Sequence, residues 1–579
     1  PTINIDGKTA LLGDKVYYRV NIDASRLTDT AYKVWRLGMT DDYDQEYLTL
    51  DAKHVEILDE TGRDRTGEFN IQDKDGVLYT FARTVDTMIP ATGETVPGDP
   101  QPDDLKAYSE KTDKDYDPLK DPSIDQSLLG HTYQVVMPMT VTKVKDGHTV
   151  ENTATQVTND KRDKTNTVTN PLKEINPKKD VTVKVGGDSI DGKSVYLNHT
   201  FLYRLDSSIL PPDRAYQTVT DWGGTDQLAT EYDQYLGNWA VYASRDLYRD
   251  GQVLAARGEK IAGSGFDSSK FGGNLFTVDA DDNGKVTADA TQTYLDLVSA
   301  DNEHEAGWVL YLQCKRIAVA DEVPNTWTET INGQPRESNK VVTKTPDMTP
   351  SIHLEKVDTP TLKQDGQEQA DRDDPKQALK MDADNIGITF IITNTSKTDP
   401  ATGDGAWYKA SDLNLADSTI VGDAHVDMDS LTYPADWDTL VLKPGESVSV
   451  TGTLKGVKEG DTHTDRAIVT GTPLVECAPS NGDPFNDKTD GGEDTDPEYS
   501  TGDVTEIDGK QLCADTQTAS NTDDWNGYRA KPLASTGTAV LGLAGGALAV
   551  LLAGGSLLVF RKRHYAQGSG RHTAVNAGK

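Results

Sequence analysis

The chain has little of what usually stabilises or targets a protein of its size. Its 579 residues include only 3 cysteines, so few disulfides can form. Acidic residues outnumber basic ones, 94 to 58, and the net charge of −36 argues against nucleic acid as a partner, because such a surface repels phosphate. There is no initiator Met and no apolar N-terminal signal segment, so we interpret the chain as the C-terminal portion of a longer exported protein.

Helical periodicity is nearly absent, and only residues 103–112 and 291–300 are suited to short helices. Apolar and polar residues instead alternate over 16–20, 133–141 and 308–314, which predicts strands. The β-branched apolar run 386–393 predicts a buried strand. Turns rich in Asn, Asp and Gly separate these segments. The sequence therefore predicts an all-β chain of tandem Ig-like β-sandwich domains in an elongated stalk.

The chain repeats itself. Ile5-Asp6-Gly7-Lys8 recurs as Ile190-Asp191-Gly192-Lys193, an offset of 185 positions, and Val150-Glu151-Asn152-Thr153 matches Val323-Pro324-Asn325-Thr326 at an offset of 173. We therefore predict two copies of one domain, at 1–173 and 174–347, separated by stiff Pro-bearing joints. A third, Ig-like surface module with an acidic loop is expected at 348–530, and a C-terminal signal at 531–579.

The C-terminal signal has three parts in a fixed order. Residues 538–560 carry no charge and are long enough to cross a bilayer as a helix, and the basic run 561–564 follows directly, which places everything before it outside the cell. Ahead of the helix stands a pentapeptide of Leu533, Ala534, Ser535, Thr536 and Gly537.

This order resembles the cell-wall sorting signal of Gram-positive surface proteins, in the L-A-x-T-G form of actinobacterial proteins. The resemblance implies that a sortase cleaves between Thr536 and Gly537 and joins the Thr carboxyl to peptidoglycan. The protein would then be extracellular and anchored to the cell wall, and it would span the membrane only before cleavage. The alternative is a plain single-span membrane protein.

Residues 1–347 resemble the second and third C-terminal domains of the streptococcal antigen I/II adhesins. The resemblance rests on the repeated Ile-Asp-Gly-Lys opening and on segments 40–44, 175–183, 232–238 and 315–319. It implies that each domain is cross-linked by an internal Lys–Asn isopeptide bond, assisted by an acidic residue. In the second copy this points to Lys179, Asn325 and the assisting acid Asp221, with Asn339 as a competing acceptor.

The first copy offers Asn152 and Asp42, while the family position of its lysine falls upstream of Pro1. Lys8 is the nearest substitute, but it occupies a turn. The chemistry explains these residue types. Burial favours the neutral, nucleophilic form of a lysine amine and the protonated form of a carboxyl group, which can then polarise the Asn carbonyl. The amine attacks, ammonia leaves, and the reaction occurs only once, so we predict that the protein is not an enzyme.

Three other features carry predictions. A disulfide between Cys477 and Cys513 would close the acidic loop, and Cys314 is expected as a buried core thiol. Lys356 and Asp465 in the third unit could chemically form a Lys–Asp bond, but we interpret them as surface charges. Residues 279–284 read as a hairpin turn rather than an EF-hand. No cofactor is expected, although the family resemblance leaves a structural calcium ion open.

The sequence as a whole predicts the stalk of a Gram-positive, wall-anchored adhesin that attaches to a host or bacterial surface receptor, with sortase and peptidoglycan as its other partners. A sortase-assembled pilus subunit is the first alternative, but the chain has no lysine in a pilin-like Tyr-Pro-Lys context. A surface-anchored hydrolase scaffold is the second. Against this alternative, the chain has no Gly-x-Ser-x-Gly or His-Glu-x-x-His motif, and its ten histidines show no metal-ligand spacing.

Overall fold

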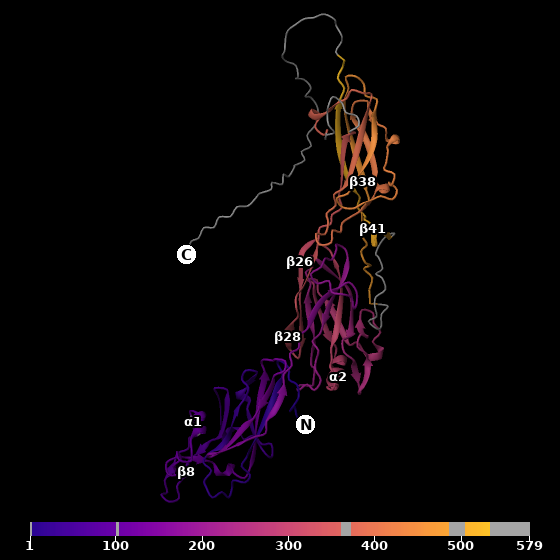
Figure 1. Ribbon diagram of the computed structural model, residues 1–579. Coiled ribbons are helices and arrows are strands. Elements are labelled where there is room, and N and C mark those ends of the chain that lie inside the picture. The colour runs from indigo at the N-terminus through magenta and orange to yellow at the C-terminus, as the bar shows by residue number, and fades with distance from the viewer. Residues whose placement is uncertain (1–2, 100–102, 360–371, 486–503, 533–579) are drawn as a thin grey trace, which may run out of the picture.

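In the computed structural model of the chain, residues 3–99, 103–359, 372–485 and 504–532 are described. They form three β-rich bodies placed end to end, with the first inclined to the other two (Figure 1). We call them the first unit (residues 3–173), the second unit (174–347) and the third unit (348–532). The fold is all-β. The two short helices, α1 (Leu105–Glu110) and α2 (Gln292–Ala300), lie where the sequence predicts them.

The first unit is built on strict alternation. Strands β1 and β11 bury every second side chain, among them Val16, Tyr18, Tyr133 and Val135, because successive residues of a strand face opposite sides. Its main sheets are β1 (Lys15–Asp23), β11 (Thr132–Val141), β3 (Leu48–Leu50) and β4 (Glu56–Asp59), and β14 (Lys161–Lys164), β13 (Ala154–Thr158), β2 (Leu37–Asp42), β6 (Val77–Ala82) and β5 (Phe69–Lys74). Two-stranded pairs complete it: β12 (Thr149–Asn152) with β15 (Val168–Pro171), β7 (Thr84–Val85) with β10 (Ser123–Ile124), and β8 (Thr87–Met88) with β9 (Thr95–Val96).

The second unit encloses its core between two five-stranded sheets. Large aromatic side chains, including Trp222, Trp308 and Trp327, fill the space between the layers. One sheet is β16 (Lys178–Thr182), β17 (Thr200–Asp206), β25 (Trp308–Arg316), β19 (Asp233–Ala243) and β22 (Lys260–Gly263). The other is β23 (Phe276–Ala280), β24 (Lys285–Ala290), β18 (Trp222–Gln227), β27 (Trp327–Ile331) and β28 (Gln334–Glu337). Two further pairs are β26 (Ala320–Asn325) with β29 (Val341–Thr345), and β20 (Leu247–Arg249) with β21 (Gln252–Ala255).

The third unit also has two main sheets around one core, and the predicted buried strand 386–393 lies inside β32. One sheet is β30 (Ile352–Asp358), β32 (Asn385–Asn394), β37 (Ser447–Lys455) and β35 (His425–Val426). The other is β31 (Leu379–Lys380), β42 (Ala519–Tyr528), β38 (Thr462–Gly471) and β34 (Asn414–Val421). Smaller groups are β39 (Leu474–Glu476), β41 (Lys510–Ala514) and β40 (Thr505–Ile507), and the pair β33 (Tyr408–Lys409) with β36 (Val441–Leu442).

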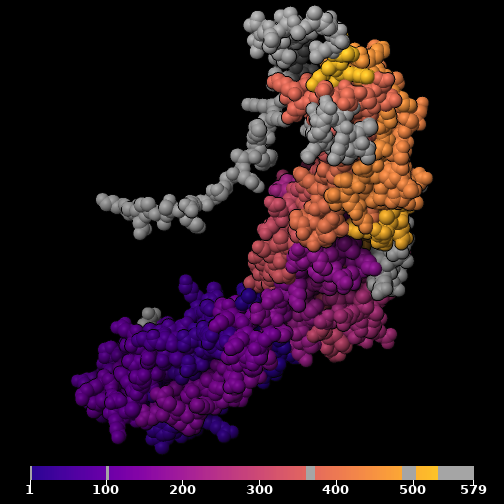
Figure 2. Space-filling model, turned by 45° about the horizontal axis from the view of Figure 1, so that its top comes forward, coloured from indigo at the N-terminus to yellow at the C-terminus, as the bar shows by residue number. Residues whose placement is uncertain are grey.

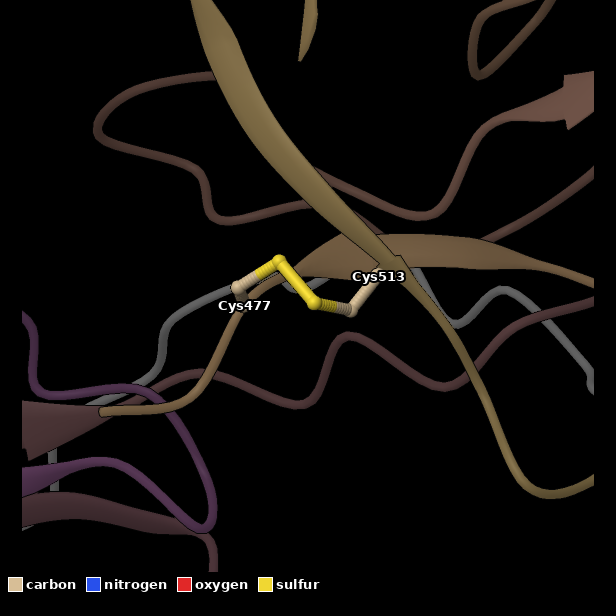
Figure 3. The surroundings of a disulfide bond; sticks show 2 residues. All are labelled: Cys477 and Cys513. Carbon is tan, nitrogen blue, oxygen red and sulfur yellow. A yellow bond between two sulfur atoms is a disulfide. The ribbon is translucent and has the colours of Figure 1, made fainter. Parts of the chain in front are cut away.

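The disulfide between Cys477 and Cys513 forms as the sequence predicts (Figure 3). It joins the residue after β39 to β41, next to the backbone pair Val475–Cys513. Cys314 is a free, fully buried thiol, which confirms its predicted place in the core. Within the described residues, no helix is long and apolar enough to cross a membrane. The predicted span 538–560 and the pentapeptide 533–537 lie outside the described residues.

A segment of the third unit lies against the second unit, and the two bodies are continuous in the space-filling view (Figure 2). Phe485, eight residues after the disulfide cysteine Cys477, is fully buried among second-unit side chains that include Tyr242 and Tyr311. Lys260 Nζ donates to the Phe485 carbonyl at 2.6 Å, and Ser264 Oγ donates to Asp483 at 2.9 Å. The disulfide therefore tethers the segment that connects the two units.

Replacing Phe485 with Ala should loosen this joint, because it removes the aromatic ring that packs among the second-unit side chains and costs about 3–5 kcal/mol of packing free energy. Small-angle X-ray scattering of the chain should then report a broader distribution of overall dimensions than for the wild type. Tyr433→Ala, which removes a half-exposed aromatic ring of the third unit, is the control and should leave the scattering profile unchanged. Identical profiles for Phe485→Ala and wild type would contradict the proposed role.

Candidate functional site

Lys179 is the most unusual side chain of the second unit. It alternates with Val181 on β16, and this alternation turns it into the core, where its side chain is 0% exposed. Its Nζ makes an ion pair with Asp226 Oδ2 and lies 4.5 Å from the centre of the Tyr203 ring. Asp226 lies on β18 of the facing sheet, so the pair bridges the two layers of the sandwich.

The environment of the Lys179 amine disfavours its positive charge. Burial lowers the pKa of the Lys179 amine from its ordinary value, and the negative charge of Asp226 only opposes that effect. The second carboxylate oxygen, Asp226 Oδ1, is buried without a hydrogen-bond partner among the described residues.

Asn325, the last residue of β26, has a buried side chain, and neither Oδ1 nor Nδ2 finds a hydrogen-bond partner in the described part of the chain. An unsatisfied buried amide costs about 1–3 kcal/mol, so such a group calls for an explanation. Two residues further on, Trp327 pairs with Asp226 across β18 and β27, and its indole donates to the Lys178 carbonyl at 3.0 Å. The end of β26 is thereby brought to the lysine strand and to Asp226.

The structure separates Asn325 from the competing acceptor. Asn339 is exposed, and both ends of its amide are used: its Oδ1 accepts from the Lys179 amide nitrogen at 2.9 Å, and its Nδ2 donates to the Lys179 carbonyl at 2.9 Å. It therefore holds the backbone of the lysine strand in place. This arrangement leaves Asn325 as the amide with free carbonyl and amino groups inside the core.

Asp221, the predicted assisting acid, does not lie at this site. It is in the turn before β18, where its Oδ1 accepts from the Gly333 amide nitrogen at 3.1 Å and its Oδ2 accepts from the Thr220 hydroxyl. Asp226, five positions further along the chain, is therefore the acid that lies beside Lys179. The physical reason is that Asp221 precedes the strand, whereas Asp226 lies on its inward face.

The first unit contains the same acid–amide pair. Asn152 Nδ2 donates to Asp41 Oδ2 at 3.1 Å, and both side chains are buried. Burial raises the pKa of Asp41 to about 6, although the hydrogen bond from Asn152 works in the opposite direction. The predicted residue Asp42 is exposed, because it is the next residue on β2 and faces the other side of the sheet. Asp41, not Asp42, is therefore the acid that lies beside Asn152.

A position for an amine remains open beside this pair. Asp41 Oδ1 and Asn152 Oδ1 are both buried without a hydrogen-bond partner among the residues that the structure describes. Lys8 does not fill the position, because its Nζ forms an ion pair with Asp213 at the joint to the second unit, 2.5 Å away.

The internal repeat of the sequence already indicates the two buried acids, Asp41 and Asp226. Asp41 and Asp226 are separated by 185 positions, the offset of the Ile-Asp-Gly-Lys repeat, and each follows a threonine, Thr40 or Thr225. In the first unit, Asp41 also continues the alternation of Leu37 and Met39, which are buried. Both signals select the residues that the structure buries.

Lys356 and Asp465 of the third unit were expected at the surface, and this expectation is wrong. Both side chains are 0% exposed, and Lys356 Nζ lies 2.5 Å from Asp465 Oδ2. Lys356 follows Ile352 and Leu354 at every second position of β30, so the pleat of the strand turns all three inward.

The segment 279–284 forms the expected hairpin turn. It connects β23 to β24, and Ala280 pairs with Val286 across it. Gly284 adopts a positive φ of 79°, a conformation in which glycine carries no steric cost. Among the residues that the structure describes, no three His, Cys, Asp or Glu side chains are grouped so that they could hold a metal ion.

Two family models match consecutive parts of this chain. Residues 2–172 match the cell surface antigen I/II C2 terminal domain, and residues 176–346 match the cell surface antigen C-terminus. Through these two domains the chain belongs to the antigen I/II family of cell-surface adhesins. Both models describe surface antigens rather than enzymes, and membership implies an extracellular, cell-surface location.

Similar proteins are known from other bacteria. Aggregation substance of Enterococcus faecalis (strain ATCC 700802 / V583) is 30% identical over 324 residues, which are 55% of this chain and 21% of that protein. The chain thus spans about a fifth of the length of this relative. The C-terminal domain of the Streptococcus pyogenes antigen I/II-family protein AspA is 22% identical, covering 59% of this chain and 95% of that one, with a TM-score of 0.44. The Streptococcus agalactiae AgI/II polypeptide BspA C-terminal domain is 18% identical, covering 59% and 96%, with a TM-score of 0.43.

The raised pKa of Asp41 predicts a pH-dependent stability of the first unit. The folded pKa of Asp41, about 6, lies above the ordinary value of 3.8. Its contribution to the stability of the first unit is therefore full below pH 4 and is lost as pH rises through 6. Asp41→Asn, which mimics the protonated acid, should therefore stabilise the first unit at pH 7 by up to about 3 kcal/mol and have little effect at pH 4.

Hydrogen exchange of β2 peptides, compared between variant and wild type at each pH, measures this difference. Asp42→Asn, at the exposed neighbouring position, is the control and should have no effect at either pH. An equal effect of Asp41→Asn at pH 4 and pH 7 would show that Asp41 is not the titrating group.

Proposed function

We propose that this chain is the stalk of a Gram-positive, cell-wall-anchored adhesin, that its Ig-like sandwich units form isopeptide cross-links by themselves, and that it mediates attachment to a host or bacterial surface receptor. The observation that carries the proposal is the buried set Lys179, Asp226 and Asn325. A stalk must resist pulling, and the second unit has no disulfide among its described residues to do so. Membership of a cell-surface adhesin family supports the same interpretation.

The buried set supports the following reaction in the second unit. Asp226 takes a proton from the Lys179 ammonium, and the neutral amine attacks the side-chain carbonyl carbon of Asn325. The protonated Asp226 hydrogen-bonds to the carbonyl oxygen, gives its proton to the leaving nitrogen and accepts the proton that the attacking nitrogen releases. A Lys–Asn amide forms, the C–N bond of the Asn amide breaks, and ammonia departs. No oxidant or cofactor is needed.

The bond would join the first strand of the unit to the end of β26. It closes a loop of about 150 residues, which in the chain-entropy description of cross-links contributes roughly 4–5 kcal/mol to stability. Its mechanical effect is larger, because a pull on the ends of the unit would pass through a covalent amide. The first unit has the buried pair Asp41 and Asn152, and we propose that this pair takes part in a cross-link of the same kind.

The mass of the chain tests the bond. We expect the intact chain to lose about 17 Da, one ammonia, at this site, and a proteolytic digest to contain a branched peptide joining the segments of Lys179 and Asn325. Lys179→Met, Asp226→Asn and Asn325→Ala should each abolish that branched peptide.

Three neighbouring substitutions serve as matched controls: Lys178→Met, Asp221→Asn and Asn339→Ala. Each changes an exposed or turn residue of the same type as its partner in the test set, and the first two should leave the branched peptide at full yield. Asn339→Ala removes the clamp on the backbone of Lys179, so it should slow formation of the bond but leave its position unchanged. A wild-type chain with linear peptides only would refute the cross-link.

Anchoring to peptidoglycan by a sortase is supported by the residue order of the C-terminus, with Leu533, Ala534, Ser535, Thr536 and Gly537 ahead of the uncharged run 538–560. The three units would then project outward from the wall. Aggregation substance is much longer than this chain, and attachment to a receptor is therefore proposed for the whole protein of which these units form the stalk.

Anchoring makes its own prediction. In a Gram-positive host that carries a sortase, Thr536→Ala should move nearly all of the chain from the fraction released by wall-digesting enzymes to the membrane fraction, because no acyl intermediate can form at Thr536. Ser535→Ala, at the variable position of the pentapeptide, should remain wall-linked. An unchanged distribution for Thr536→Ala would exclude sortase attachment at this residue.

A further inference from the structure

The third unit contains a second buried lysine site, outside the two stretches that the family models match. Lys356 lies on β30, and its side chain is 0% exposed. Its Nζ lies 2.5 Å from Asp417 Oδ2 on β34 and 2.5 Å from Asp465 Oδ2 on β38. All three strands line one core, with β30 in one sheet and the two acids in the facing sheet.

The neighbours of this triad are apolar or uncharged on most sides. The ring of Phe390 lies 5.5 Å from Lys356 Nζ, and Trp525, fully buried, pairs with Asp465 across β38 and β42. His463 is buried as well, and its Nε2 lies 3.0 Å from Asp465 Oδ2. The backbone nitrogen of Lys356 donates to Asp523 at 2.5 Å, which fixes the strand beside the acids.

Two carboxylates and one ammonium cannot all keep their charges cheaply in this space. Burial and the nearby Asp465 raise the pKa of Asp417 to about 6, although Lys356 opposes the effect. One carboxyl group beside the amine is thus readily protonated. A protonated acid in this position can hydrogen-bond to the second carboxyl group and polarise its carbonyl for attack by the amine.

The chain order identifies the role of each acid. In the second unit the lysine comes first, the acid opposite it second and the acceptor last, as Lys179, Asp226 and Asn325. In the third unit the same order gives Lys356, Asp417 and Asp465. Asp465 occupies β38, which lies between β42 and β34 in the centre of its sheet, so a bond to it ties the first strand to the middle of the opposite layer.

We propose that the third unit forms an isopeptide bond between Lys356 Nζ and Asp465 Cγ, with Asp417 as the assisting acid. A proton first passes from the Lys356 ammonium to the carboxylates. The neutral amine then attacks Asp465 Cγ while Asp417 hydrogen-bonds to the carbonyl oxygen. The C–N bond forms, one C–O bond of Asp465 breaks, and the oxygen leaves as water with two protons, one returned by Asp417 and one released by the attacking nitrogen. The reaction is a condensation, so no oxidant, reductant or cofactor takes part.

This bond does not depend on the cross-link of the second unit, and the two are separable by mass. Digestion of the intact wild-type chain should give a branched peptide joining the segments of Lys356 and Asp465, with a deficit of about 18 Da rather than the 17 Da of the Lys179 site. Lys356→Met should abolish this peptide and leave the Lys179 peptide intact. Lys455→Met, at an exposed ion pair with Asp427 in the same unit, should affect neither.

A single substitution tests which acid is the acceptor. Asp465→Asn would lose ammonia instead of water, and the amide product is the same from either residue. The cross-linked variant and the cross-linked wild type should therefore have identical masses, although their sequences differ by about 1 Da. Asp417→Asn should retain a linear chain at this site, because the assisting acid is gone.

Each remaining outcome counts against the proposal. Linear peptides throughout the third unit of the wild type would show an ion-paired triad without a bond. A branch that maps to Asp417 would reverse the roles of the two acids and overturn the assignment. A wild-type branch at Asp465 that persists at full rate in Asp417→Asn would remove Asp417 from the mechanism.

Discussion

A lysine amine held in a dry β core against a carboxylate is the interaction that sets this chain apart from ordinary β-sandwiches. An ion pair in such a place costs several kcal/mol in lost hydration, and replacement by apolar residues often stabilises a protein. Lys179 and Lys356 nevertheless lie in two different cores, each with its side chain 0% exposed and each on the first strand of its unit. The proposed covalent amides would account for both lysines, because condensation removes the charges that the core disfavours.

The position of these lysines bears on how each unit would respond to a pull on the chain ends. In each unit the lysine strand enters the domain, and the acceptor lies on a strand of the facing layer or beside it, so force from the chain ends would be carried by the amide. The joint between the second and third units is also held by specific contacts. Phe485 fills a pocket of the second unit, and the Cys477–Cys513 disulfide holds the segment that carries it. The second and third units are therefore linked by more than their connecting strand.

Much of this arrangement could be predicted from sequence, since alternation and internal repeats are local signals. The all-β class, the two short helices, the disulfide and the buried Cys314 follow from such patterns. Asp42 and Asp221 were chosen by position from the family resemblance, whereas the repeat offset selects Asp41 and Asp226, the acids that lie beside Asn152 and Lys179. Lys356 was placed at the surface because it is charged, although its strand register turns it inward. The contact of Phe485 with another unit has no local signal at all.

Single-molecule pulling of the whole chain by its ends tests the central claim most directly, because it measures whether the second unit can be extended. With a bond between Lys179 and Asn325, the force passes through the bond, and the residues between them are not stretched. Their release would otherwise add on the order of 500 Å of extended chain. We predict that the wild type lacks this step and that Lys179→Met shows it. A wild-type chain that releases the full length would contradict the account.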